Sequence, residues 1–268
     1  MPTAVDVECI WVGQKKISVP FAIAWRSFGR DPHEYIGDRK KGTLVHSPLH
    51  KGTMNVRVID EFFKHDELQN YVKARDAWSR KILDFFMNTD EIIKAPYEEI
   101  IEELCDDVIE NGGVLMGHCV YKDIVESLWN GDCIFKTCIF PHGPQFKSPK
   151  IPNWTDMTLV CTRKAFTDPN LNEKFLRRYP NLIDTSLEAL AMAIRGSQNF
   201  HQSHLPQDDV DLLIEVLDHV YTHVSKQDFW NIVSMKRDHY DCVPVNVHMP
   251  ACNQFDTAQI FDQESLKS

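Results

Sequence analysis

Four histidines in the last third of the chain have the clearest metal-ligand character. His219 and His223 are four residues apart, so both side chains lie on one face if this segment is helical. His201 and His204 precede that segment, and four imidazoles could together bind zinc or a softer divalent ion. No Glu follows His219 directly, so the zinc-protease pattern is absent. We expect these four histidines to lie on a charged surface and the protein to bind no cofactor. A metal site formed by the four histidines is the alternative.

Eight cysteines are many for a chain without the basic leader of a secretory signal, which indicates a reducing, intracellular location. Most of the thiols are therefore expected to be reduced and buried. Cys242, His248 and Cys252 have a spacing loosely similar to a zinc knuckle, but no C-x-x-C pair supports it. Any disulfides are expected between chains, after assembly, and from cysteines in extended or loop-flanking segments: Cys9, Cys133, Cys242 and Cys252.

No catalytic motif stands out. The chain lacks G-x-S-x-G, a Walker loop and G-x-G-x-x-G, and Gly112-Gly113 is better explained as a helix end. We therefore expect no catalytic residues and no enzyme. Two alternatives stay open, namely a metal-dependent or thiol enzyme and a helical interaction or regulatory module of a virus.

Most of the chain has the residue periodicity of α-helices, so helices are expected to position the candidate residues. Apolar residues recur at intervals of three and four in most segments from residue 58 onward, whereas residues 1–25 alternate as in two extended segments. Pro20 predicts that the second extended segment lies at an edge. The predicted fold class is mainly α, an irregular helical bundle with short extended segments and extended terminal arms. Helices are expected at about 58–87, 96–111, 114–129, 169–179, 184–196, 207–224 and 226–238, with short strands at 132–140 and Thr158–Cys161.

Composition shifts divide the chain into five parts. Four prolines between residues 141 and 153 suggest a linker, and the last 30 residues have no period. The parts are an extended, basic arm region (1–57), a helical subdomain (58–140), a proline-rich linker (141–153), a second helical subdomain (154–240) and an extended C-terminal arm (241–268).

Charge is distributed unevenly along the chain. The net charge of −10 argues against a general nucleic-acid binder, and no apolar run is long enough to span a bilayer. Residues 26–57 carry seven Lys and Arg against three acids, whereas residues 98–110 carry seven acids and no base. Such complementarity could set the register between copies of the chain. The candidate assembly contacts are Arg39, Lys40, Lys41, Glu98, Glu99, Glu102, Glu103 and Asp106.

In overall character, with its arms, charge belts, many cysteines and lack of catalytic motifs, the chain resembles the occlusion-body matrix proteins of insect viruses. The helical content resembles the nudivirus type of these polyhedrins. The likeness extends over the whole chain and rests on no short motif. It implies a structural protein that crystallises around virions in the host-cell nucleus, protects them in an occlusion body and dissolves at alkaline pH. The implied partners are the chain itself and the virion surface.

Overall fold

The computed structural model describes residues 1–12, 17–29, 48–66, 68–70, 77–89, 92–128, 157–197 and 199–233. Within them the chain forms one mixed sheet of seven strands, in the order β5-β4-β2-β1-β6-β7, with β3 paired to β2 beside this path. The strands are β1 (Thr3–Val12), β2 (Ile17–Gly29), β3 (His50–Lys51), β4 (Asn55–Ile59), β5 (Ile93–Ala95), β6 (Val114–Gly117) and β7 (Thr158–Cys161).

The middle of the sheet combines antiparallel and parallel pairs. β1 and β2 form a long antiparallel hairpin, and β4 adds antiparallel to β2. On the other side of β1, β6 pairs parallel to β1, and β7 pairs parallel to β6. β1 therefore has a neighbour on each side, and its carboxyl end points the same way as those of β6 and β7.

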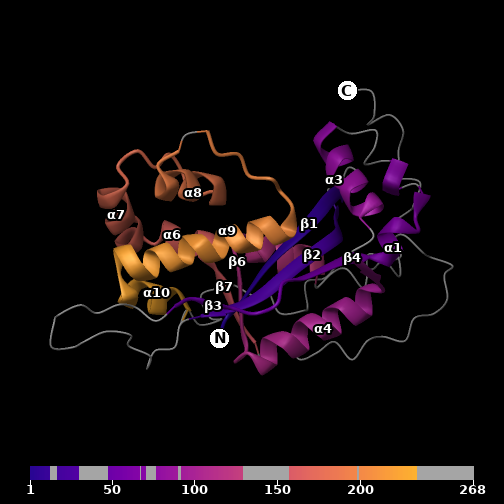
Figure 1. Ribbon diagram of the computed structural model, residues 1–268, viewed down its shortest axis with the longest axis horizontal. Helices are drawn as coiled ribbons and strands as arrows, with labels where there is room; N and C mark the ends of the chain where they lie inside the picture. The colour runs from indigo at the N-terminus through magenta and orange to yellow at the C-terminus, as the bar shows by residue number, and fades with distance from the viewer. Residues whose placement is uncertain are drawn as a thin grey trace.

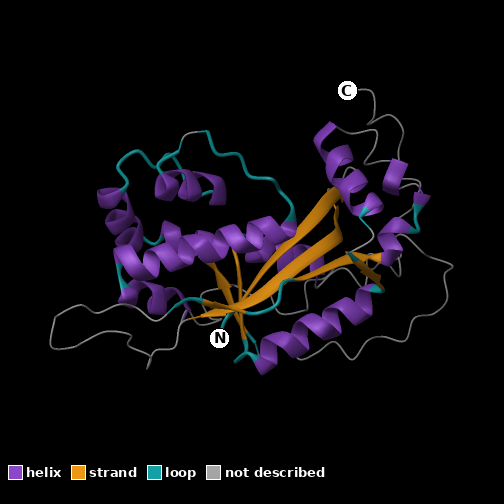
Figure 2. Cartoon of the chain, in the orientation of Figure 1, coloured by secondary structure: helices purple, strands orange, loops and turns teal. Residues whose placement is uncertain are grey.

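Helices cover both faces of the sheet (Figures 1 and 2). α4 lies against one face, and α9 crosses the other, where α8 packs beside it. The helices are α1 (Asp60–Phe63), α3 (Ala77–Asn88), α4 (Tyr97–Glu110), α6 (Thr162–Thr167), α7 (Pro169–Arg178), α8 (Leu187–Arg195), α9 (Pro206–His219) and α10 (Lys226–Val233), with π-helical turns η2 (Tyr121–Leu128) and η5 (Val220–Val224).

Alternate side chains of β1 are buried in two separate hydrophobic cores, one on each face of the sheet. Successive side chains of a strand point to opposite faces. Val5 and Val7 are buried in the core on the α4 side, whereas Ala4 is buried with the apolar residues of α9. The residues that follow Ala4 on its face are Asp6 and Glu8, so two carboxylates point toward the α9 side of a central strand.

The fold class predicted from the sequence, a mainly α bundle with extended terminal arms, is wrong. The two N-terminal segments form the centre of a sheet, because β6 and β4 from later in the chain complete the pairing on either side. Pro20 lies inside β2, where a register shift between Glu8 and Cys9 breaks the regular ladder that a proline would interrupt. Residues 114–117, predicted as the start of a helix, form β6.

Other elements agree with the sequence. The strand predicted at Thr158–Cys161 is β7, and α4 ends at Glu110 with Asn111 as its C-cap, before Gly112 and Gly113, which have positive φ angles. Asp168 caps α7 by accepting hydrogen bonds from two backbone N–H groups of its first turn. The segments predicted as a strand (132–140), a linker (141–153) and a C-terminal arm (241–268) lie outside the described residues.

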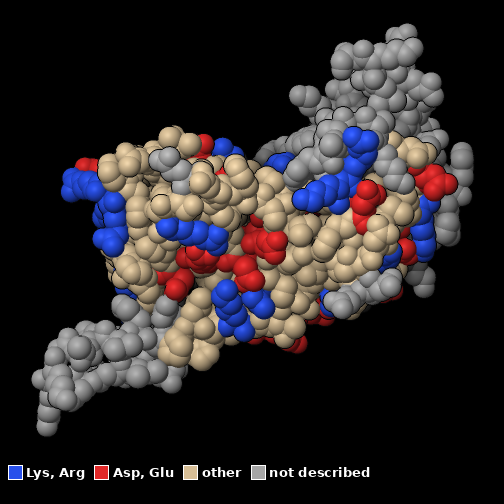
Figure 3. Space-filling model, turned by 45° about the horizontal axis from the view of Figure 1, so that its top comes forward, with Lys and Arg blue, Asp and Glu red and all other residues tan. Residues whose placement is uncertain are grey.

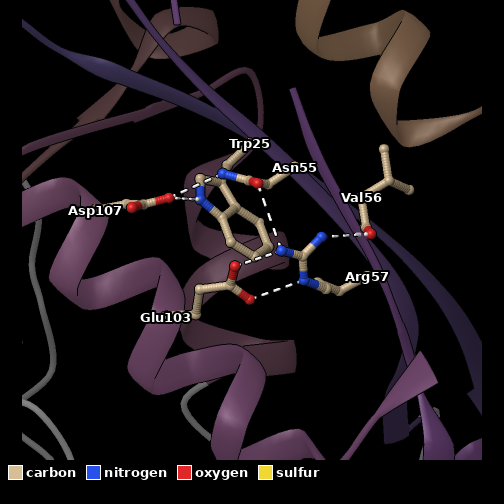
Figure 4. A network of polar contacts seen from close by, with 6 residues as sticks. All are labelled: Trp25, Asn55, Val56, Arg57, Glu103 and Asp107. Atoms are coloured by element: carbon tan, nitrogen blue, oxygen red, sulfur yellow. Dashed lines mark hydrogen bonds and ion pairs between the residues drawn. The ribbon is translucent and has the colours of Figure 1, made fainter. Parts of the chain in front are cut away.

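A polar network fastens α4 to the sheet (Figure 4). The indole N–H of the buried Trp25 donates to Asp107 Oδ2 at 2.6 Å, and Asn55 Nδ2 donates to the same oxygen at 2.9 Å. One turn earlier on α4, Glu103 forms a bidentate ion pair with the guanidinium of Arg57, in which Nε lies 2.8 Å from Oε2. Such pairs fix orientation as well as distance. They hold α4 in register with β2 and β4.

Replacing Asp107 with Ala should destabilise the protein by about 1–3 kcal/mol, because the buried indole N–H of Trp25 loses its acceptor. The free energy of unfolding from urea titration measures the effect. The matched control is Asp106→Ala, since Asp106 is exposed on the same helix and should change stability by less than about 0.5 kcal/mol. Equal losses for the two variants would contradict the role of the network.

Candidate functional site

Three carboxylates from distant parts of the chain meet on the α9 face of β1. Asp6 and Glu8 alternate on β1, and Asp209 lies in the first turn of α9. One oxygen from each lies within 4.8 Å of the others. Asp6 and Glu8 are half-buried and Asp209 is buried. Like charges at this spacing repel, so the cluster needs protons or cations to be stable.

Asp123, on η2, supplies a fourth carboxylate beside these three. The chain leaves β6 at Gly117 and turns at once into η2. A Cβ on Gly117 would lie 3.0 Å from Val120 Cγ2 and 3.4 Å from the carbonyl oxygen of Val5, so this turn is too tight for a side chain. Asp123 is buried and close enough to Asp6 to raise its pKa. The turn after Gly117 thus brings Asp123 to the middle of β1.

Ser127 locks η2 onto the hairpin. Its Oγ lies 2.6 Å from Ser18 Oγ and 3.2 Å from Cys9 Sγ, and it donates to the carbonyl oxygen of Lys122 at 2.8 Å. These contacts join η2 to both central strands. π-Helical turns of this kind often occur at functional sites.

Burial and mutual repulsion shift the pKa values of the cluster upward. Burial is the main cause for Asp6, whose pKa rises well above its ordinary value, and Asp123 adds to the rise. Burial also raises the pKa of Glu8, with further contributions from Asp6 and Asp209. The pKa of Asp209 rises to about 8, first through burial and then through Asp6. Asp6, Glu8 and Asp209, which favour protonation when no metal is bound, favour divalent cations for the same electrostatic reason.

An oxygen without a partner points to the same conclusion. Asp209 Oδ2 accepts a hydrogen bond from Gln202 Nε2 at 2.5 Å, but Oδ1 is buried and has no hydrogen-bond partner. A buried oxygen of this kind is costly unless a ligand occupies its free side. Hard cations such as Mg²⁺ and Mn²⁺ prefer carboxylate oxygens. The donor set therefore fits a magnesium or manganese centre.

His204 lies just before α9, five residues before Asp209. Its φ is +57°, an uncommon backbone conformation for a residue other than glycine. Neighbouring bonds stabilise the segment: Gln202 N donates to Glu188 Oε1, and Leu205 N donates to Ser203 Oγ. Burial, assisted by the charge of Lys122, lowers the pKa of His204. The imidazole is therefore neutral near pH 7 and able to accept a proton.

Lys122 contributes a positive charge to the electrostatic environment of the cluster. Its side chain is exposed, whereas that of the next residue, Asp123, is buried. Its charge partly offsets the rise in the pKa of Asp6 and of Glu8 that burial and like charges cause. One ammonium thus acts on carboxylates of β1 and on His204, which precedes α9.

The four histidines predicted as a possible metal site do not converge. His201 is exposed, with Nδ1 3.4 Å from Glu188 Oε1. His219 and His223 stack with ring centroids 4.3 Å apart, and His219 Nε2 contacts the hydroxyl of Tyr179. Of the four, His204 is the one nearest along the chain to Asp209 of the carboxylate cluster.

The other predicted residues lie elsewhere. Cys9 has a free, half-buried thiol next to Ser127, whereas Cys133, Cys242 and Cys252 lie outside the described residues. The acids Glu98, Glu99, Glu102, Glu103 and Asp106 belong to α4, on the opposite side of the sheet from α9, and Arg39, Lys40 and Lys41 are not among the described residues.

Sequence reasoning missed the carboxylate cluster, although two local signals were present. Asp6 and Glu8 interrupt an otherwise apolar strand, where charged side chains are costly unless a function requires them. Asp209 stands within the apolar pattern of its helix, and it follows His204 closely.

The surface near α9 is a mosaic of charges. On the face seen in Figure 3, acidic side chains gather near the middle, with lysine and arginine side chains beside them. Along α9, Asp211 accepts from Arg26 at 2.7 Å and from Lys51 at 3.1 Å, and Glu215 pairs with Arg195 at 2.6 Å. The net charge of the chain therefore says little about the charge at any one site.

None of the helices in the described part of the chain combines the length and the apolar character that a membrane crossing requires. No family model and no curated protein matches the chain. Evidence about the site therefore comes from its geometry.

Without divalent metal, the protein should lose about 4 kcal/mol of stability as pH rises from 5 to 9. The pKa of Asp209 is raised to about 8 in the folded state, so its stabilising proton is fully present below the unfolded value near 4 and is lost as pH rises through 8. Urea unfolding in EDTA at several pH values measures this slope. Asp209→Asn should flatten the slope, and Mn²⁺ should restore stability at pH 9. A slope that is the same in Asp209→Asn would contradict the assignment.

Proposed function

We propose that the protein is a metal-dependent nuclease that hydrolyses phosphodiester bonds with two divalent cations. The observation that carries this proposal is the meeting of Asp6, Glu8 and Asp209, one of whose oxygens is buried without a partner, with the buried Asp123 close enough to raise the pKa of Asp6. Two-metal sites of nucleases and polymerases activate an attacking water and stabilise the leaving oxygen on opposite sides of the phosphate.

The ligand chemistry favours phosphate over peptide substrates. Mg²⁺ is usually held by one or two carboxylates per ion and completes its shell with water and substrate phosphate oxygens. Four carboxylates therefore suffice for two ions and leave positions open for a phosphodiester. Zinc hydrolases instead use histidine ligands, and among the described residues His201, His219 and His223 are not gathered around a common point.

His204 supports hydrolysis in particular. A general base must be neutral at the working pH and must lie near the attacking water. The lowered pKa of His204 meets the first condition, and its place just before α9, five residues from Asp209, is the reason to assign it the second. We expect its imidazole to accept the proton of the water that attacks the phosphorus. The uncommon φ of this residue is consistent with a side chain held in place for function.

The proposed function departs from two expectations of the sequence, that the chain is no enzyme and that it binds no nucleic acid. Net charge argued against nucleic acid, but bound cations would offset the carboxylates locally. Assembly into an occlusion body stays a prediction. The site favours a nuclease because a lattice protein gains nothing from burying four carboxylates together.

The purified chain should degrade a single-stranded oligonucleotide labelled at its 5′ end when Mg²⁺ or Mn²⁺ is present, and EDTA should stop the reaction. Asp6→Asn and Asp123→Asn should each lower the rate by about a thousandfold, since each removes a metal ligand. His204→Ala should lower it by about a hundredfold while the oligonucleotide still binds. Denaturing gels measure the rates. Products shortened one nucleotide at a time indicate attack from the 3′ end, and discrete fragments indicate internal cleavage.

Glu99→Gln is the matched control, because Glu99 is an exposed carboxylate on α4, across the sheet from the cluster. It should retain full activity. The proposal is wrong if the wild-type protein binds Mn²⁺ at the cluster but cleaves neither DNA nor RNA, or if Asp6→Asn cleaves as fast as Glu99→Gln.

A further inference from the structure

We infer that Lys122 is a substrate-binding residue whose ammonium contacts a backbone phosphate of the nucleic-acid strand at the metal centre. This inference rests on the proposed nuclease function and adds to it a residue that recognises the strand without reading its sequence. Phosphate contacts of this kind set affinity and position rather than base preference.

The position of Lys122 is determined by its neighbours in η2. Asp123 points inward and is buried, so the preceding side chain leaves η2 in another direction and reaches solvent. Ser127 binds the carbonyl oxygen of Lys122 and also contacts Ser18 and Cys9 on the two central strands. The backbone from which the lysine projects is therefore anchored next to Asp123, and its side chain is exposed.

Charges from several elements converge on this ammonium. It acts on Asp6 and Glu8 of β1 and on His204 before α9, in addition to its neighbour Asp123. Lys122 directly precedes Asp123 on η2, and η2 packs against β1, the strand that carries Asp6 and Glu8. The lysine therefore projects from the element that supplies Asp123, where a phosphate bound to the metal ions would pass.

The charge of the metal-filled site explains why a lysine would be needed for binding the strand. Two divalent cations neutralise the four carboxylates, so the filled centre by itself offers no excess positive charge to an anionic strand. The ammonium of Lys122 then becomes the positive charge that the phosphodiester meets. In the transition state the phosphoryl oxygens gain further negative charge, which strengthens the same contact.

A competing explanation makes Lys122 a stand-in for metal, a cation that only reduces repulsion between carboxylates in the metal-free protein. The two explanations predict different results. A stand-in would compete with metal, so its removal would tighten Mn²⁺ binding and leave strand binding at saturating metal unchanged. A phosphate contact would leave its signature in the salt dependence of strand binding.

The experiment measures the affinity of the full chain for fluorescein-labelled oligothymidylate in Ca²⁺, over a range of salt concentrations, with gels to confirm that the strand stays intact. For a single strand, the slope of log affinity against log salt changes by about 0.7 for each phosphate that the protein no longer neutralises. Lys122→Ala should show this decrease together with about tenfold weaker binding at low salt. Lys122→Arg should keep the wild-type slope, and Lys122→Glu should weaken binding further.

Lys94→Ala is the control, because Lys94 is an exposed lysine on the edge strand β5 and should leave the slope unchanged. Unchanged circular dichroism would show that the variants are folded. An unchanged slope in Lys122→Ala, or tighter Mn²⁺ binding with normal strand affinity, overturns the inference while the nuclease function stands. A wild-type chain that neither binds nor cleaves any strand would overturn both.

Discussion

Four carboxylates held together against their own repulsion are the constraint that explains most of the surrounding structure. Bringing Asp6, Glu8 and Asp209 together, with Asp123 nearby, costs desolvation and Coulomb energy, which appear as raised pKa values of the first three. The rest of the fold has to supply that energy. A central strand with neighbours on both sides, under helices on both faces, provides the packing to do so.

Each element that carries a carboxylate is positioned by a separate contact. The hairpin of β1 and β2 presents Asp6 and Glu8 toward α9, Gly117 permits the tight exit from β6, and Ser127 ties η2 to the hairpin. On the opposite face, the bonds from Trp25 and Arg57 hold α4. The two faces have different roles. One supplies ordinary core packing with a polar anchor, and the other concentrates the charged groups.

Stability and function oppose each other at this site. The metal-free protein is strained by charge, and cations or protons relieve it, so folding and metal binding are linked. His204 and Lys122 belong to the same electrostatic environment as the carboxylates, and Lys122 helps keep the imidazole neutral. A catalytic base and a substrate contact can thus be set by one cluster of charges. Natural sites often depart from optimal stability in this way.

The sequence by itself determined the local elements. Caps and periodicity predicted α4, α7 and the strand at Thr158–Cys161, because the signals for these elements lie within a few residues of each other. The alternation in residues 1–25 was recognised too, but not its place at the centre of the sheet. Pairing of β1 with β6 joins Thr3 to Leu115, a separation along the chain that no periodicity measures.

Only the tertiary structure decided the site. Asp6 and Asp209 are about two hundred residues apart, and nothing in the neighbourhood of either names the other as a partner. Parallel addition of β6 to β1 and the crossing of α9 over that strand bring them together, and both depend on burial of apolar surface in the whole chain. His219 and His223 show the reverse case. Their spacing suggested a metal site, but the two rings stack on each other and His219 contacts Tyr179, because helical spacing aligns side chains without making ligands converge.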